Sequence, residues 1–328
     1  MPVLPGGVLN QIRVAVVGAG QFGRNHCRVV HQSPRAVLSA VVDVDAARAA
    51  EAAAAAGAQP FTSIEKLRDV ADAAIVAAPT AVHSEVGCRL MEAGLDVLVE
   101  KPVAPDLPSA DRLVETAARL GRILQVGHLE RFNPGVRAVV RRATLPLFFE
   151  VHRLSVFSPR SLDIDVVLDL MIHDIDIVLR LTGAEPLDIR AAGISILSPK
   201  VDIANVRLEF ENGCVANLTA SRVSTDRVRK LRLFQPRQYL SLDYARQDVA
   251  IVTVGTDHQI AFEQAPVTKA EPLALQFDAF LDAVESRCAP ETSGESARRS
   301  LKVGLAILDK IKEHAEVVSQ SLVSGWKP

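Results

Sequence analysis

The chain has 328 residues, of which 48% are hydrophobic and 23% are charged, and its formal net charge is −2. This length suggests about two domains, and the composition is typical of a globular protein. The small net charge and the 4% of aromatic residues argue against binding of nucleic acid. No apolar run approaches the roughly 20 residues that span a bilayer.

The first ten residues do not resemble a signal peptide. The four cysteines lie far apart and form no CxxC pair, so they give no support to a zinc site or a redox-active dithiol. We therefore expect a cytoplasmic protein with no metal site, and with neither a membrane nor a nucleic acid among its partners.

The first third of the chain alternates short apolar runs with helical patterns. The predicted strands are residues 12–17, 37–42, 73–78, 97–100 and 123–126, and the predicted helices between them are 23–31, 45–56, 83–93 and 108–120. Strands that alternate with helices predict βαβ units, right-handed crossovers and a parallel sheet.

A glycine-rich segment, Gly18-Ala19-Gly20-Gln21-Phe22-Gly23, directly follows the first predicted strand and opens a helix. In a G-x-G-x-x-G motif the glycines permit a tight turn, close approach of a pyrophosphate, and packing of helix on strand. Asp43 ends the second strand, where a carboxylate accepts hydrogen bonds from the adenosine ribose. We expect NAD, with NADP the weaker candidate, because Asp43 would repel a 2′-phosphate, although Arg48 is nearby. The alternative is a glycine-rich turn of another α/β domain.

Glu100-Lys101-Pro102 ends the strand predicted at 97–100. The carboxyl ends of parallel strands face the ligand crevice, so Lys101 is expected to point toward cofactor and substrate. Pro102 favours an extended Lys101 and permits a cis bond. Taken alone, the tripeptide is better explained by a surface lysine before a loop proline.

The pattern changes after about residue 126, and we expect domains at residues 1–126 and 127–328. A strand at 148–157 and a helix at 164–182 precede a predicted antiparallel meander and two closing helices. The expected meander strands are 188–195, 204–210, 215–222, 229–234, 238–242 and 249–253, and the closing helices are 273–286 and 294–316.

Within the predicted helix 164–182, Asp169 and His173 are four positions apart and share a face, and Asp176 lies three positions further on. Acids and a histidine on a largely apolar helix need partners or a wet cleft. The alternatives are a buried structural histidine with a capping acid, or, with less support, a zinc site.

Together and in this order, GAGQFG, Asp43, EKP and D-x-x-x-H-x-x-D resemble the family of glucose–fructose oxidoreductase, inositol dehydrogenase and MocA proteins. The resemblance covers nearly the whole chain. It implies an α/β chain with an N-terminal Rossmann domain and a C-terminal α+β domain that contains a large, mostly antiparallel sheet. It also implies hydride transfer between a sugar-like substrate and NAD(P), and a homodimer or homotetramer formed through the open face of the second sheet.

Carried over position by position, the resemblance assigns catalytic roles to Lys101, His173 and Asp169. Met171 is a departure, because the family often has glycine two residues before the histidine, which leaves the shape of the substrate pocket open. The resemblance places further residues beside the cofactor, in addition to the glycines and Asp43: Gln21, Phe22, Pro79, Thr80, His83, Glu100 and Lys101.

The segment 127–134, GHLERFNP, and the segment 169–176, DLMIHDID, resemble bacterial members that oxidise the 3-hydroxyl of UDP-N-acetylglucosamine. Planar guanidinium groups suit a diphosphate. The candidates for substrate binding are Arg131, Asn133, Arg153, Arg160 and Arg222, together with Asp169 and His173. Alternative functions are a dehydrogenase of a free sugar or inositol, a glycosidase that uses NAD transiently, and a non-catalytic NAD-binding regulator.

Overall fold

The computed structural model describes residues 11–157 and 164–323. These residues divide into two compact units, each described here by itself. The first contains residues 11–127 and Leu273–Glu295, and the second contains His128–Pro272 and residues 296–323. Among the residues described, no helix has the length and apolar character that a membrane-spanning segment requires.

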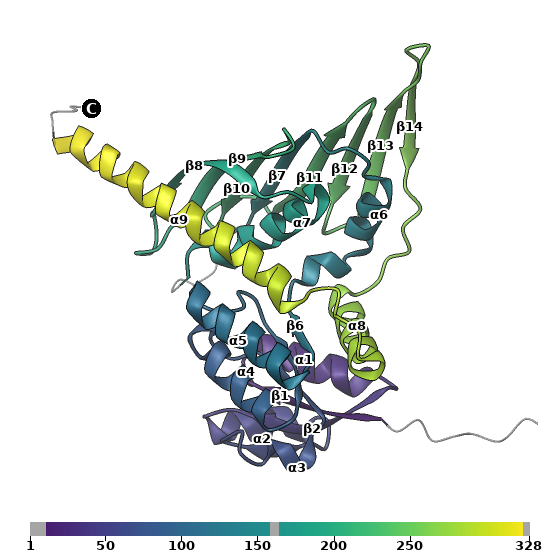
Figure 1. Ribbon diagram of the computed structural model, residues 1–328, viewed down its shortest axis with the longest axis vertical. Coiled ribbons are helices and arrows are strands. Elements are labelled where there is room, and N and C mark those ends of the chain that lie inside the picture. Colours follow the sequence, from purple (N-terminus) through teal and green to yellow (C-terminus); the bar gives the residue numbers. More distant parts are fainter. Residues whose placement is uncertain (1–10, 158–163, 324–328) are drawn as a thin grey trace, which may run out of the picture. The chain divides into compact units, whose positions relative to one another are not determined.

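The first unit contains a six-stranded sheet in the order β3-β2-β1-β4-β5-β6. Every neighbouring pair of strands is parallel, as the sequence predicts. The strands are β1 (Ile12–Val17), β2 (Ala36–Val42), β3 (Gln59–Phe61), β4 (Ala73–Val76), β5 (Asp96–Val99) and β6 (Leu124–Val126). The helices are α1 (Gln21–Gln32), α2 (Ala46–Ala54), α3 (Leu67–Val70), α4 (His83–Glu92), α5 (Leu107–Leu120) and α8 (Pro272–Ser286) (Figure 1).

The central strands β4 and β5 are buried along their whole length, which explains the apolar sequences Ala73–Val76 and, after Asp96, Val97–Val99. The chain crosses from one half of the sheet to the other after β3, and β4 then pairs with β1, so the strand order reverses between β1 and β4. Ligands of such sheets bind at this switch point, beyond the carboxyl ends of the strands. The loops after β1, β4 and β5 therefore lie where a nucleotide is expected.

Two elements of the first unit are absent from the sequence prediction. Strand β3 has only three residues, contains Pro60 and forms the edge of the sheet, a position where proline is tolerated. Helix α3 has only four residues. Both are too short to produce a periodic pattern, and the strand predicted as the fourth is therefore β5.

The segment Leu273–Glu295 belongs to the first unit in the structure, although the sequence interpretation places it in the second domain. Phe277, Phe280 and Leu281 of α8 are buried. Gln125 of β6 donates to the backbone oxygen of Gln276 at 3.0 Å. An amphipathic pattern predicts that a helix is packed, but not which of two sheets it packs on.

The second unit contains an eight-stranded sheet in the order β14-β13-β12-β11-β7-β10-β9-β8. The strands are β7 (Phe148–Leu154), β8 (Pro186–Ile194), β9 (Ile203–Phe210), β10 (Val215–Ser221), β11 (Val228–Gln235), β12 (Gln238–Asp243), β13 (Asp248–Val254) and β14 (Ile260–Gln264). Only β7 and β10 are parallel neighbours, so the expectation of a mostly antiparallel sheet is confirmed. A single meander is wrong, because β7 separates β8–β10 from β11–β14.

One face of this sheet is covered by α6 (Pro134–Arg142), α7 (Ile172–Thr182) and α9 (Gly294–Val323) (Figure 1). The alternation along β7 follows from this arrangement, since Phe149, Val151 and Arg153 are buried while the residues between them are half-buried. The prediction omits α6 and β14. Strand β14 is exposed along its whole length and gives no alternating signal. Helix α6 does have a start signal, Asn133 followed by Pro134.

Candidate active site

The glycine-rich loop joins β1 to α1, and its three motif glycines differ in what requires them. Gly18 has a φ of +100°, and a Cβ there would lie 2.5 Å from the backbone oxygen of Ala77. A Cβ at Gly23 would collide with the backbone oxygen of Gly18. A Cβ at Gly20 would meet no atom of the described residues within 4 Å. Packing of the chain therefore requires Gly18 and Gly23, whereas Gly20 borders open space at the N-terminus of α1, as a site for a pyrophosphate requires.

Asp43 follows β2 and is tied to this loop. Its Oδ2 accepts the N–H of Ala19 at 2.8 Å, and its Oδ1 accepts the N–H of Asp45 at 2.9 Å. Arg48 Nη2 lies 3.4 Å from Oδ1. A hollow of about 250 Å³ is lined by residues of α2 and by 60–62, and the backbone oxygen of Phe61 in this lining accepts the backbone N–H of Asp43 at 3.1 Å. The carboxylate is thus fixed beside the loop, where a ribose hydroxyl is expected.

The loop after β4 carries three of the predicted cofactor residues. Pro79 precedes a 3-10 turn that starts at Thr80, and both residues lie just beyond the carboxyl end of the strand. His83 is buried, with Nε2 2.9 Å from the backbone oxygen of Ala78 and Nδ1 3.0 Å from that of Pro102. His83 therefore links the loop after β4 to the loop after β5. Gln21 and Phe22 are exposed at the start of α1.

Glu100, Lys101 and Pro102 follow β5, and the Lys101–Pro102 peptide bond is cis. Glu100 is buried, and its Oε1 lies 2.8 Å from His26 Nε2. Its Oε2 accepts the Lys101 N–H at 3.2 Å. Burial raises the pKa of Glu100, but the hydrogen bond from His26 and the positive charges of His26 and Lys101 outweigh burial and lower that pKa below its usual value.

The helix that carries Asp169 and His173 in the second unit is not uniform. Val167–Met171 forms a π-helical turn, and α7 follows from Ile172. Asp169 and His173 are half-buried, and the His173 ring meets the edge of His128 with a centroid distance of 6.3 Å. Wide turns of this kind occur frequently at functional sites. The predicted pair thus lies at the wide turn, and not on an uninterrupted α-helix.

Asp174 and Asp176 are buried, and each forms a bidentate ion pair with one buried arginine. Arg131 contacts Asp176 through two bonds of 2.6 Å. Arg153 contacts Asp174 at 2.7 and 2.9 Å, and Glu130 at 2.9 Å. Burial lowers the pKa of Arg153, but the charges of Asp174 and Glu130 raise it well above its usual value. Burial raises the pKa of Asp176, and the charge of His128 and the bond from Arg131 lower it overall.

The predicted substrate residues of the second unit therefore have partners within that unit. Asn133 donates to Glu130 and to the backbone oxygen of Tyr244, at 3.1 and 3.0 Å. Arg131 is committed to Asp176. Arg160 lies outside the described residues. These contacts favour structural roles for Arg131 and Asn133, and their contact with substrate stays a prediction.

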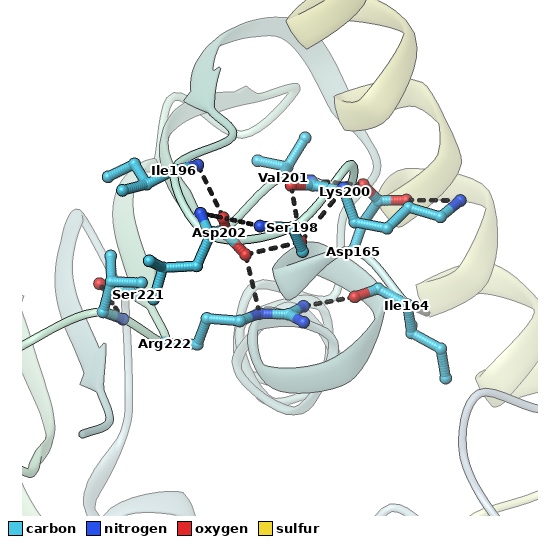
Figure 2. A network of polar contacts seen from close by, with 11 residues as sticks. Ile164, Asp165, Ile196, Ser198, Lys200, Val201, Asp202, Ser221 and Arg222 are labelled. Carbon is cyan, nitrogen blue, oxygen red and sulfur yellow. Dashed lines mark hydrogen bonds and ion pairs between the residues drawn. The ribbon is translucent and has the colours of Figure 1, made fainter. Parts of the chain in front are cut away.

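Arg222, at the end of β10, belongs to a cluster around Asp202 (Figure 2). Asp202 accepts the backbone N–H groups of Ile196, Leu197 and Ser198 at 2.7, 2.6 and 3.1 Å. Arg222 Nε lies 3.7 Å from Asp202 Oδ1, and its guanidinium donates to the backbone oxygen of Ile164. The cluster therefore ties the loop between β8 and β9 to the residues that precede the π-helical turn.

Replacement of Asp202 by asparagine is expected to lower the free energy of unfolding at pH 7 by about 1–3 kcal/mol. Burial raises the pKa of Asp202, but the N–H donors of Leu197, Ile196 and Ser198 lower it to about 2, from a usual value of 3.8. The stabilisation is thus fully present above about pH 4 and is lost as the pH falls through 2.

Urea unfolding of wild type and Asp202→Asn at pH 7 and at pH 3 measures this difference. It should be smaller at pH 3, and Asp226→Asn, an exposed acid of the same unit, should leave both values unchanged. If the difference in free energy of unfolding between wild type and Asp202→Asn grew toward low pH, the Asp202 carboxylate would not be the stabilising group.

Sequence reasoning missed four residues that the structure connects to the predicted site residues: His26, His128, Glu130 and Asp174. His26 lies on the buried face of α1 beside Cys27 and Val30. A histidine on an otherwise apolar helix face is the signal that could have identified it.

Comparisons with known proteins agree with this architecture. Residues 12–128 match the model of an oxidoreductase family with an NAD-binding Rossmann fold, and residues 137–237 match the GFO/IDH/MocA C-terminal domain. The UDP-N-acetylglucosamine 3-dehydrogenase of Acidithiobacillus ferrooxidans is 36% identical over 303 residues, which cover 90% of this chain and 96% of the relative. An inositol 2-dehydrogenase of Corynebacterium glutamicum is 31% identical, over 77% of this chain and 82% of the relative.

A solved structure of the Acidithiobacillus ferrooxidans enzyme superimposes with a TM-score of 0.87 and 35% identity, covering 92% of this chain and 98% of that one. An oxidoreductase of Desulfitobacterium hafniense has a TM-score of 0.84 at 17% identity, over 93% and 96% of the two chains, and shows the fold alone. The fold and the comparisons define a Rossmann-type oxidoreductase that uses a nicotinamide cofactor. The chain belongs to the GFO/IDH/MocA family, as its motifs suggest.

Proposed function

We propose that this enzyme oxidises the 3-hydroxyl of UDP-N-acetylglucosamine to a 3-keto sugar, with NAD as hydride acceptor. One observation carries the proposal: the likeness to the Acidithiobacillus ferrooxidans dehydrogenase extends through both units, at 36% identity over 90% of this chain. Inositol 2-dehydrogenases at 31% identity support oxidation of a free inositol as the alternative.

The residues around the glycine loop fit a dinucleotide. The open space beside Gly20 and the N-terminus of α1 suit a pyrophosphate, and Asp43 suits a ribose diol. We propose that Gln21, Phe22, Pro79 and Thr80 line the same site. A bound nicotinamide supplies the hydride-accepting carbon. The carboxylate of Asp43 disfavours a 2′-phosphate, which is the reason to prefer NAD over NADP.

The chain's own part in the reaction is proton transfer and charge stabilisation. We assign to His173 removal of the substrate hydroxyl proton, as the carbinol C–H bond breaks and hydride leaves. Histidine is the common general base near neutral pH. Asp169 orients the imidazole, and the ammonium of Lys101 stabilises negative charge on the reacting oxygen. Arg131, Asn133, Arg160 and Arg222 stay predictions for contact with the diphosphate.

An absorbance assay of NADH formation tests the proposal, with UDP-N-acetylglucosamine, UDP-N-acetylglucosaminuronate, free sugars and inositols as substrates. We expect the highest kcat/KM with UDP-N-acetylglucosamine, and a higher value with NAD than with NADP. A coupled aminotransferase removes the keto sugar if the equilibrium opposes oxidation. Turnover with inositols alone would favour the alternative dehydrogenase. Hydrolysis of a glycoside without net NADH would indicate a glycosidase, and NAD binding without any turnover would indicate a regulator.

We further propose that the chain assembles as a homodimer or homotetramer through the sheet of the second unit, in the cytoplasm. Helices cover one face of this sheet, while the other face carries the aromatic cluster Phe148, Phe234 and Tyr239. Light scattering over a series of protein concentrations measures the molar mass of the particle and hence the subunit number. A monomer at all concentrations would contradict this assembly.

A further inference from the structure

We propose that His26 is a positioning residue for Lys101, acting through Glu100, and that Glu100 serves Lys101 rather than the cofactor. The inference rests on the proposed function of Lys101 but uses contacts that lie entirely within the first unit. It assigns a role to a buried histidine that the reaction itself does not use.

The environment of His26 leaves it one polar contact. Its ring is 1% exposed, and Nε2 lies 2.8 Å from Glu100 Oε1. Its Nδ1 is buried and has no hydrogen-bond partner among the described residues. A buried polar atom without a partner costs stability, so an apolar residue at this position would avoid that loss of folding free energy. The contact with Glu100 is what the imidazole provides.

Glu100 connects His26 to the backbone of Lys101. One carboxylate oxygen faces His26, and the other accepts the backbone N–H of Lys101 at 3.2 Å. Gly127 also packs closely against the carboxylate, because a Cβ at that position would lie 2.7 Å from Glu100 Oε2. Both oxygens are therefore directed at groups of the chain, and the carboxylate has a single well-defined position.

The bridge joins the two parts of the first unit that the reaction needs. His26 belongs to α1, whose N-terminus borders the proposed pyrophosphate site, and Glu100 precedes the proposed catalytic lysine. The titratable groups that face Glu100 are His26 from α1, Lys101 from its own loop and His83 from α4. A rigid link between α1 and this loop sets the position of Lys101 relative to the bound cofactor.

The test compares His26→Leu, His26→Gln and Val30→Ala with wild type. Leucine removes the bond to Glu100, whereas the glutamine amide restores a donor close to the position of Nε2. Val30 is a fully buried residue of the same helix, and Val30→Ala controls for loss of packing. In His26→Leu, we expect kcat to fall by up to about 100-fold through displacement of Lys101, with little change in the Kd for NADH.

The pH profile separates positioning from loss of structure. Without the His26 bond the pKa of Glu100 rises. Protonation of Glu100 then adds its effect to that of His173, the proposed base, so the acidic limb of kcat should move to higher pH in His26→Leu. It should return toward the wild-type position in His26→Gln and stay unchanged in Val30→Ala. Equal losses of kcat in His26→Leu and Val30→Ala, without a shift of the limb, would overturn the inference.

A second readout is independent of the substrate. The rate at which formaldehyde and a borohydride methylate Lys101, followed by peptide mass spectrometry, should rise severalfold in His26→Leu and in Glu100→Gln, and should not change in Val30→Ala. An unchanged rate in both variants would refute the bridge even if the enzyme oxidises UDP-N-acetylglucosamine. A raised rate in an enzyme inactive on that sugar would keep the bridge and reject the proposed substrate.

Discussion

Replacement of His173 by asparagine is expected to lower kcat by about 10²- to 10⁴-fold, because the variant lacks the general base that removes the hydroxyl proton. The Kd for NADH should stay unchanged, since the glycine loop and Asp43 belong to the other compact unit. Steady-state kinetics with UDP-N-acetylglucosamine, together with titration of NADH fluorescence, measures both quantities.

His152→Asn supplies a matched control. His152 is on β7, on the sheet face opposite the buried Val151 and Arg153, and its replacement should leave kcat unchanged. Partial recovery of turnover in His173→Asn on addition of imidazole would support the proton-transfer role. Wild-type turnover in His173→Asn would show that another group is the base.

Replacement of Gly20 by alanine is expected to weaken NADH binding by about 10- to 100-fold. The added Cβ would keep the pyrophosphate away from the backbone N–H groups, and the loss corresponds to about one hydrogen bond to a charged group. The fold should be unaffected, because the backbone of Gly20 (φ −68°, ψ −173°) suits any residue and a Cβ there meets no described atom within 4 Å. Fluorescence titration measures the Kd, and a thermal melt without cofactor measures Tm.

Gly23→Ala provides the contrast, because its Cβ would collide with the backbone oxygen of Gly18. The Tm of this variant should be lower than that of wild type, even in the absence of any ligand. If Gly20→Ala bound NADH as tightly as wild type, the pyrophosphate would not lie against Gly20, and the position assigned to the cofactor would be wrong.

The parallel sheet was predictable because each of its central strands is a separate apolar run with a helix on either side. The exceptions have physical reasons. Strand β3 is short and contains Pro60, and the position of β7 between β10 and β11 depends on pairing between residues far apart in sequence. Periodicity reports which face of a strand is buried, but not which strand lies next to it.

The candidate site was predictable where a residue type and its place on the fold coincide, as for the glycines, Asp43 and Lys101. The partners of the arginines could not be predicted in this way. Arg131 is held by Asp176, an acid 45 positions away in sequence. Nothing local distinguishes such an arginine from one that faces a ligand, because the partner is supplied only by the tertiary structure.

The path of the chain has a consequence for synthesis on the ribosome. The parallel partner of β7 is β10, and its antiparallel partner is β11, both made long after it. The first unit also waits for Leu273–Glu295 before it is complete. The second unit in turn lacks residues 296–323 until these have been translated. Neither unit can therefore finish folding before most of the chain has been translated, so apolar strand surface is exposed during most of elongation, when nascent chains are most open to chaperones and to aggregation.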